Sequence, residues 1–180
     1  MKKLIILGCI LLAGCSRTPL DMETDNLTLD QLWEMTPADF SSLMARPEQG
    51  GGQVVVGPSF QAYAYIDLVQ VLRAEKSADG SRRFYMFVNS RYKGDLDGVT
   101  GARFRDGTPA DWKLLGSGNG NCIQTIDGCK IFEMIQVAIP VNQLSGYGDR
   151  SLEVVFTRPG HGEIVAALPP RYVRYFLEYL

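Results

Sequence analysis

The four cysteines are the most reactive side chains of this 180-residue chain. A thiol can act as a nucleophile, bind a metal, join a disulfide or carry an acyl group. Cys122 and Cys129 lie close together in the segment NCIQTIDGCK, whereas Cys9 and Cys15 lie near the N-terminus, within or directly after an apolar run. The chemistry open to each pair depends on the compartment of the protein, which the N-terminal segment indicates.

The first fifteen residues have the pattern of an export signal. Lys2 and Lys3 precede an uncharged run from Leu4 to Ala13. A helix of about 10 residues is roughly 15 Å long, which is half of the ~30 Å hydrocarbon core of a membrane. A basic start, a short apolar middle and a small-residue end are typical of a secretory signal peptide. Cys9 would be removed with this segment.

The end of the run, Leu12-Ala13-Gly14-Cys15, resembles the lipobox of bacterial lipoproteins. The resemblance implies cleavage before Cys15, a diacylglycerol on its thiol and usually a third acyl chain on its amino group. Two or three acyl chains hold a protein firmly on a membrane, since each buried methylene contributes about 0.8 kcal/mol. Ser16, rather than aspartate, follows the cysteine, which resembles the sorting pattern for the outer membrane. A secreted protein with a chance cysteine is the alternative.

In an exported protein, Cys122 and Cys129 would meet an oxidising compartment, where an even pair of cysteines tends to close. The Asp-Gly pair just before Cys129 is typical of a turn between two strands. The alternative is a metal site, but zinc takes about four ligands and His161 is the single histidine of the chain. The sequence therefore predicts a disulfide, and neither a metal nor a cofactor.

Other candidate chemistry lacks the required partners. The chain has no Gly-x-Ser-x-Gly elbow, and His161 has no identifiable acid or nucleophile beside it. GDLDGVTG lacks the third acidic ligand and the closing glutamate of a calcium loop, and GSGNGN lacks the lysine of a phosphate loop. The acidic residues show no spacing that marks a glycosidase pair. We therefore predict that the chain is not an enzyme.

Glu133 interrupts the apolar segment KIFEMIQVAIP. A carboxylate at this position needs a partner if it faces inward, or else it faces water. Arg103 or Arg105 is the expected partner, in a structural role.

Charge and hydropathy argue against a nucleic-acid-binding protein and against a membrane-spanning helix. The chain carries 18 lysines and arginines against 20 acidic residues, with a formal net charge of −2. Nucleic-acid binding needs a basic stripe that neutralises phosphates, and no such cluster is present. No second apolar run approaches the ~18 residues of a membrane helix, so the acyl chains on Cys15 are the expected membrane attachment.

The rest of the chain predicts a signal peptide over 1–14, a lipidated polar tether over 15–27 and a single domain over 28–180. β-Branched and apolar segments, separated by Gly, Asp, Asn or Pro clusters, favour an antiparallel β-sandwich over a βαβ sheet. These segments are 53–56, 60–72, 83–89, 99–105, 112–115, 130–139, 151–157 and 163–168. Helix is the competing interpretation for residues 60–75.

Helices are expected at both ends of the domain. Within 28–46, Thr28 and Gln31 fit a capping box, and Thr36-Pro37 fits a second helix start. The side chains expected to share buried faces are Leu29, Leu32 and Trp33 in the first helix and Phe40, Leu43 and Met44 in the second.

Pro170 can open a C-terminal helix with two stripes. The core-facing stripe comprises Val173, Phe176, Leu177 and Leu180. The second stripe comprises Tyr172, Tyr175 and Tyr179. These tyrosines either pack at the edge of the core or form a docking surface for a protein partner.

The order of features in the mature chain resembles uncharacterised bacterial lipoproteins: a cysteine-flanked hairpin, a glutamate-bearing strand and a closing P-x-Y-V-x-x-F-L at 170–177. That resemblance implies no activity. We expect an outer-membrane lipoprotein on the periplasmic side that binds or scaffolds an envelope protein, as a machine subunit or as an inhibitor. The alternatives are an envelope hydrolase on glycan or peptide, and a carrier of an apolar ligand.

Overall fold

The computed structural model describes residues 26–49, 52–62, 67–93, 98–119, 130–144, 146, 149–160 and 162–180. Its strands are β1 (Glu48–Gln49), β2 (Gly52–Val56), β3 (Leu68–Lys76), β4 (Arg82–Lys93), β5 (Gly101–Phe104), β6 (Trp112–Asn119), β7 (Lys130–Ile139), β8 (Leu152–Arg158) and β9 (Gly162–Leu168). Its helices are α1 (Leu29–Glu34), α2 (Pro37–Ser42), α3 (Val141–Leu144) and α4 (Pro170–Tyr179).

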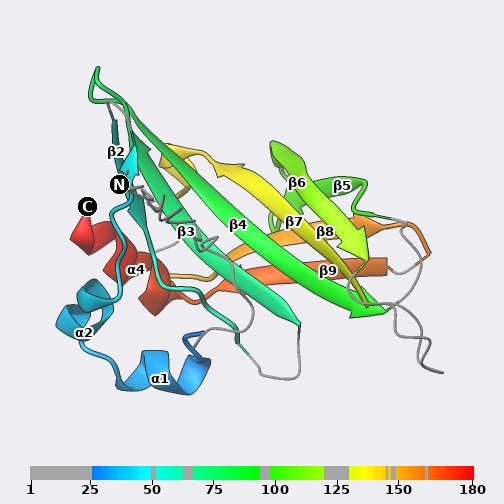
Figure 1. Cartoon of the computed structure of the whole chain (residues 1–180), viewed down its shortest axis with the longest axis horizontal. Coiled ribbons are helices and arrows are strands. Elements are labelled where there is room, and N and C mark those ends of the chain that lie inside the picture. The colour runs from blue at the N-terminus through cyan, green and yellow to red at the C-terminus, as the bar shows by residue number, and fades with distance from the viewer. Residues whose placement is uncertain are drawn as a thin grey trace, which may run out of the picture.

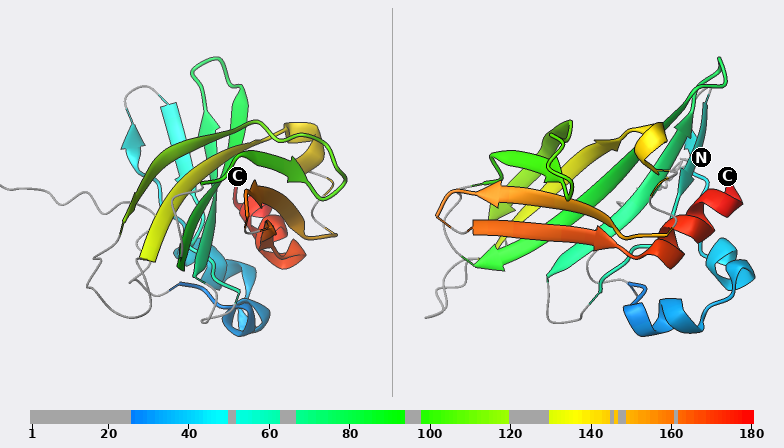
Figure 2. Two further views of the ribbon diagram at one scale, coloured as in Figure 1. Left: turned by 90° about the vertical axis from the view of Figure 1, so that its right-hand side faces the viewer. Right: turned by 180° about the vertical axis from the view of Figure 1, so that it is seen from behind.

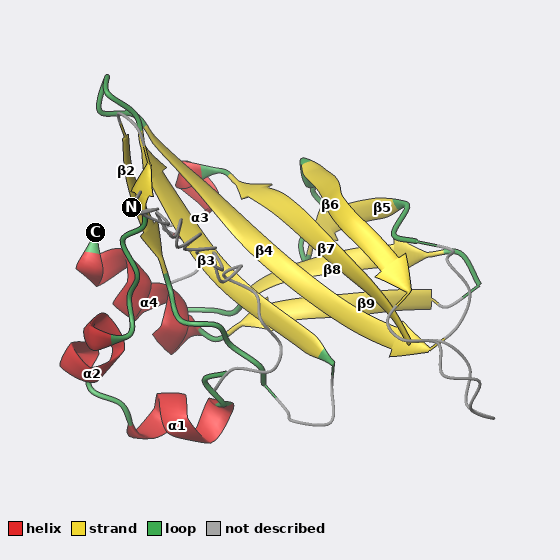
Figure 3. Cartoon of the chain, viewed as in Figure 1, coloured by secondary structure: helices red, strands yellow, loops and turns green. Residues whose placement is uncertain are grey.

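The described strands form two antiparallel sheets, which confirms the predicted mainly-β fold. The larger sheet has the order β1-β2-β3-β4-β7-β6 and the smaller sheet has the order β5-β8-β9. Figures 1 and 3 show the smaller sheet lying against one face of the larger one. Side chains from both sheets contribute to one hydrophobic core, so the arrangement is a sandwich whose layers are not joined into a closed barrel.

This core consists of apolar side chains that occupy alternate positions along the strands. Met86 of β4 faces Leu72 of β3 on one side and Val137 of β7 on the other, and all three side chains are buried. Because successive side chains of a strand point to opposite faces, every second residue of β3, β4 and β7 enters the core. Phe104 of β5 and Phe156 of β8 supply the facing layer.

Residues 60–75 are the segment for which the sequence allowed either a strand or a helix. Residues 68–76 form β3, paired with β4 along its whole length, so the helical interpretation is wrong there. Phe60 makes an isolated bridge with Gln70 outside the named strands. Of the residues that the structure describes in the extended segment predicted over 60–72, those from Leu68 onward belong to a regular strand.

The helices begin where the sequence predicts. Thr28 and Thr36 both form capping boxes, and α4 begins at Pro170. Figure 2 shows α1, α2 and α4 gathered at one end of the sheets. Phe40 of α2 packs edge-on against Tyr172 of α4, with ring centroids 5.1 Å apart. The helical layer thus closes this end of the core.

Two side chains expected on buried helical faces lie at the surface instead. Leu32 is buried, but Trp33 is 61% exposed, and Leu43 at the end of α2 is also exposed. Each helix has only six residues. Less than two turns of helix buries a narrow face, and the residue next to a buried one then points outward.

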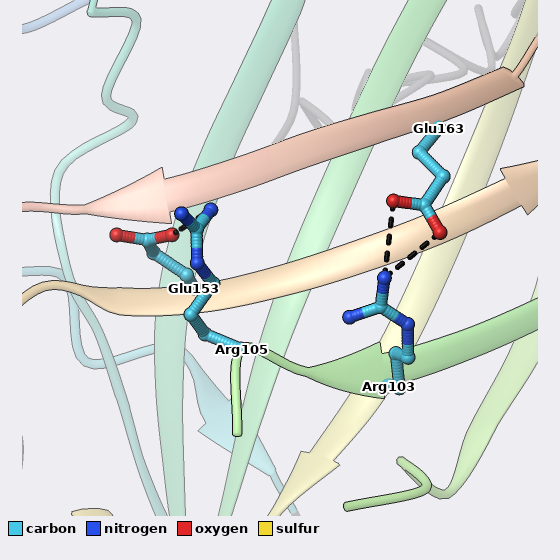
Figure 4. Close-up of polar contacts among 4 residues, drawn as sticks. All are labelled: Arg103, Arg105, Glu153 and Glu163. Atoms are coloured by element: carbon cyan, nitrogen blue, oxygen red, sulfur yellow. Dashed lines mark hydrogen bonds and ion pairs between the residues drawn. The ribbon is translucent and has the colours of Figure 1, made fainter. Parts of the chain in front are cut away.

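Two ion pairs cross the outer face of the smaller sheet (Figure 4). One guanidinium nitrogen of Arg103 lies 2.8 and 3.0 Å from the two carboxylate oxygens of Glu163. Arg105 lies 3.1 Å from Glu153. Arg103 on β5 and Glu163 on β9 belong to strands that pair with β8 and not with each other. Val155 of β8, which faces Arg103, is almost completely buried.

Candidate functional site

A buried ion pair joins the two sheets at the end of the sandwich where β4 ends. Glu133 of β7 and Arg158 of β8 have side chains that are 1% and 4% exposed. Arg158 Nη2 donates to Glu133 Oε2 over 2.7 Å and to Ser90 Oγ of β4 over 3.0 Å. A buried charge of this kind is tolerated only when it is paired and hydrogen-bonded.

Further contacts surround both charges, although Arg158 Nε is buried without a hydrogen-bond partner among the described residues. The backbone N–H of Val99 donates to Glu133 Oε1 over 3.0 Å. The guanidinium carbon of Arg158 lies 3.5 Å from the ring centroid of Tyr92, where the ring quadrupole attracts a cation. A Cβ on Gly98 would lie 2.6 Å from Glu133 Oε1, so glycine lets the backbone approach the carboxylate.

The expected partner of Glu133 was wrong, although its structural role as one half of an ion pair is as expected. Arg103 and Arg105 bind Glu163 and Glu153 on the outer face of the smaller sheet. Arg158 takes their place because it shares the core-facing side of β8 with buried residues such as Phe156. Both oxygens of Glu133 accept hydrogen bonds from the protein, which suits a clamp between sheets better than a general base.

The three tyrosines of α4 do not form a common exposed surface. Tyr172 is fully buried, and its hydroxyl donates to the Pro58 carbonyl over 2.7 Å. Burial raises the pKa of Tyr172 well above that of a free tyrosine, while a hydrogen bond from the Leu72 backbone opposes the rise. Tyr175 is also buried. Only Tyr179 is partly exposed, with the guanidinium carbon of Arg46 4.9 Å from its ring centroid.

These positions correct the docking surface predicted for Tyr172, Tyr175 and Tyr179. The packing interpretation holds for the first two, because the surrounding helices and β3 enclose them. The Tyr175 hydroxyl accepts from Arg171 Nε over 2.9 Å and lies 3.3 Å from the Met35 carbonyl of the α1 C-cap. The tyrosine stripe therefore attaches α1 and α2 to the sandwich.

A different aromatic surface, not predicted from the sequence, lies at this end of the molecule. Arg171 donates to the carbonyls of Trp33 and Met35 over 2.9 and 2.8 Å. Its guanidinium carbon lies 5.6 Å from the ring centroid of Trp33. Trp33 is nevertheless the most exposed of the large hydrophobic side chains in the described ranges. The arginine thus fixes the end of α1 and lies against the indole that this helix presents.

A cleft opens between the sheets at the end where β4 begins. Its volume is about 550 Å³, and we call it the inter-sheet cleft. The residues that line it include Arg82, Phe84, Phe104, Asp111, Ile139 and Val141. Phe84 and Ser90 are six residues apart along β4, so this cleft and the buried ion pair are separated by roughly 20 Å. No sequence pattern indicated it, because its walls come from both sheets.

Several predicted site residues lie outside the described residues, namely Cys15, Cys122, Cys129 and His161. In the described ranges, no three histidine, cysteine, aspartate or glutamate side chains lie where they could hold a metal ion. None of the described helices is long and apolar enough to cross a membrane. Comparison with models of protein families, with curated proteins and with solved structures found no match to this chain.

Proposed function

We propose that the protein is a lipid-anchored binding module of the bacterial cell envelope that docks a protein partner through the surface around Trp33. The observation that carries the proposal is an indole that is 61% exposed and yet lies on a helix end held by Arg171. Tryptophan is enriched among the residues that dominate protein interfaces. Holding its backbone in place before binding lowers the entropy lost on association.

The position of this surface fits the proposed anchor. Leu27 is bound through its backbone: its N–H donates to the Ser59 carbonyl over 2.8 Å, and its carbonyl accepts from the Gln61 N–H over 3.0 Å. A lipidated Cys15 would precede Leu27 by a tether that reaches roughly 40 Å at full extension. Trp33 follows Leu27 by six residues, which add roughly 10 Å. The proposed partner therefore lies within about 50 Å of the periplasmic face of the outer membrane.

This role needs no catalytic group, cofactor or nucleic acid, and it suits either an accessory subunit of an envelope machine or an inhibitor of a periplasmic enzyme. A carrier of an apolar ligand is the second candidate function, because the inter-sheet cleft is lined mainly by apolar side chains. An envelope hydrolase draws no support from the buried ion pair, whose carboxylate is already bonded on both oxygens.

Photo-crosslinking in living cells tests the docking surface. The photoreactive residue p-benzoylphenylalanine would replace Glu34, which is exposed next to Trp33, and in a parallel strain would replace Val165 on β9, which is 41% exposed. We expect one dominant envelope protein to crosslink from position 34 and not from position 165. The adduct should disappear in Trp33→Ala and persist in Phe132→Ala, a matched change of another exposed aromatic.

Folding is checked in the same variants. Because Trp33 and Phe132 are both exposed, we expect each change to alter the free energy of unfolding by only about 0.5 kcal/mol. An adduct that survives Trp33→Ala in a folded protein would refute this surface. Arg171→Lys keeps the charge and loses the planar fork, so it should weaken the adduct while leaving the domain folded.

The anchor has its own test. Metabolic labelling with palmitate should mark the wild-type protein and leave Cys15→Ala unlabelled, since the acyl chains are proposed to sit on this residue. Labelling that persists in Cys15→Ala would place the acyl group elsewhere and remove the basis for the tether geometry.

A further inference from the structure

The floor of the inter-sheet cleft is part of the hydrophobic core. Phe84 of β4 faces Ile139 of β7 in register, and Phe104 of β5 supplies the opposite layer. All three are at most 5% exposed. The cleft therefore runs directly above close-packed apolar side chains. An apolar group placed there would be removed from water on the sides that touch both sheets.

The rim is charged, and its charge is unevenly distributed. Arg82 and Arg83 begin β4 on one side, and Asp111 lies on the other. Arg82 has the same parity along the strand as Phe84, so its side chain starts on the face of the sheet that lines the cleft. The side chain of Arg83 starts on the opposite face and lines the cleft at the start of the strand. Within the described residues, neither arginine lies within 4.0 Å of a carboxylate in an ion pair, although the pKa of Asp79, lowered mainly by hydrogen bonds from Ser81, is also lowered by the charge of Arg83.

The contacts that the two arginines do make are long. Arg82 Nη2 lies 3.3 Å from the backbone oxygen of Leu180, and Arg83 Nη2 lies 3.4 Å from Ser77 Oγ. Charge-assisted bonds from arginine to a carboxylate are usually about 2.7–2.9 Å long. A carboxylate entering the cleft therefore offers both guanidinium groups a shorter bond than they have now.

From this arrangement we infer that the inter-sheet cleft binds a long-chain carboxylate, with the alkyl chain over Phe84, Phe104 and Ile139 and the head group at Arg82, with Arg83 beside it on the rim. The volume of about 550 Å³ lies within the ~300–1,000 Å³ typical of small-molecule sites. The guanidinium groups of Arg82 and Arg83 make their side of the rim positive, which matches a carboxylate head group. The inference does not depend on docking at Trp33.

The probe is dodecanoate, titrated calorimetrically below its micelle concentration. The protein is the full mature chain made with Cys15→Ser, so that no acyl group or detergent competes with the probe. We expect saturable binding with one site. Dodecyltrimethylammonium, which reverses the head-group charge, and butyrate, which shortens the chain, should each bind at least tenfold more weakly.

Substitutions of the rim arginines test whether these residues bind the carboxylate. Arg82→Gln/Arg83→Gln should weaken dodecanoate binding about tenfold or more, because both charge-assisted bonds are lost. Both arginines are exposed, so the double variant should fold normally. Arg174→Gln on α4, which also removes an exposed arginine, should leave the affinity unchanged.

Fluorescence quenching locates the alkyl chain of the bound carboxylate. The protein has two tryptophans, and Trp112 directly follows Asp111 of the cleft. In a Trp33→Phe background, 11-bromoundecanoate should quench the fluorescence of Trp112. In a Trp112→Phe background, it should leave the fluorescence of Trp33 unchanged.

Three results would overturn the assignment. They are equal affinity for dodecanoate and dodecyltrimethylammonium, unchanged affinity in the double arginine variant, and no saturable binding at all. A protein crosslinked from position 141 at the rim, without binding of any probe, would assign the cleft to a protein partner instead. Each of these outcomes leaves the result at Trp33 unaffected, so the two proposals fail separately.

Discussion

Arg158 of β8 and Glu133 of β7 meet in the interior with 2.7 Å between Nη2 and Oε2, and so connect two sheets that share no described strand. Ser90 of β4 receives a second bond from the same nitrogen. One guanidinium of the smaller sheet thus bonds to two strands of the larger sheet at once, at the end of the sandwich away from the helices.

Removing one member of this pair should be strongly destabilising. Glu133→Gln keeps an acceptor for the Val99 N–H but leaves the charge of Arg158 buried without a counter-charge, at a cost of about 3–5 kcal/mol. Arg158→Met should cost a similar amount. The double variant buries no charge and should recover much of the loss. Urea unfolding measures all three, with Arg105→Ala as the exposed control. Single variants as stable as wild type would contradict a clamp.

Tyr172 should make the fold sensitive to alkaline pH. Burial raises its pKa above the usual value of about 10. At a pH between the pKa of Tyr172 in the unfolded chain and its raised pKa in the folded chain, the unfolded chain has lost a proton that the folded chain retains. Stability is therefore complete below about pH 10 and falls above it by up to about 1.4 kcal/mol per pH unit. Thermal unfolding between about pH 9 and about pH 11 should show a shallower decline in Tyr172→Phe and an unaltered one in Tyr179→Phe.

Gly57 should be intolerant of a side chain even though its backbone is not strained. A Cβ at this position would overlap the Tyr172 hydroxyl and lie 3.2 Å from Phe176 Cδ2. Overpacking of this kind usually costs about 1–3 kcal/mol. Gly116→Ala is the control, because no atom lies within 4 Å of its Cβ. Denaturation midpoints should fall for Gly57→Ala only. Partial recovery in Gly57→Ala/Tyr172→Phe would identify the hydroxyl as the obstacle.

The ion pair between Arg103 and Glu163 should contribute little in comparison. Its side chains are 38% and 51% exposed, and exposed pairs are typically worth about 0.2–1 kcal/mol. A double-mutant cycle of Arg103→Met and Glu163→Gln should give a coupling energy in this range, reduced at about 1 M salt by screening. A larger coupling energy that salt does not change would mean that the pair is effectively buried.

Local signals in the sequence predicted most of the secondary structure. Thr28 and Thr36 mark helix starts through hydrogen bonds to residues three positions away. Each capping box can therefore be predicted from residues that are close together in the sequence. Pro170 marks a third start without a side-chain capping hydrogen bond, because its fixed φ and missing N–H suit the first position of a helix. The strand segments were recognised because alternation and turn residues are also local properties.

Properties that depend on the tertiary arrangement were not predictable in the same way. Glu133 and Arg158 are brought together by two sheets whose pairing no short segment encodes. One signal was available: Arg158 has the same parity as Leu152, Val154 and Phe156, so the alternation of β8 already placed a charge among core residues. Tyr172 and Tyr179 belong to one stripe by spacing, yet only the packing of α2 and β3 separates them into a buried and a partly exposed residue.

The pairing of β4 with β7 determines when the sheet can be completed. β3 and β4 are joined by the short turn from Ser77 to Ser81, and such hairpins form in about 1–10 μs. β7 must arrive from much farther along the chain, since Phe84 faces Ile139, and folds dominated by distant pairings take roughly milliseconds to seconds. During that interval the 12-residue β4 has an unpaired edge, which is where a nascent chain aggregates. Dilution during refolding should therefore raise the yield.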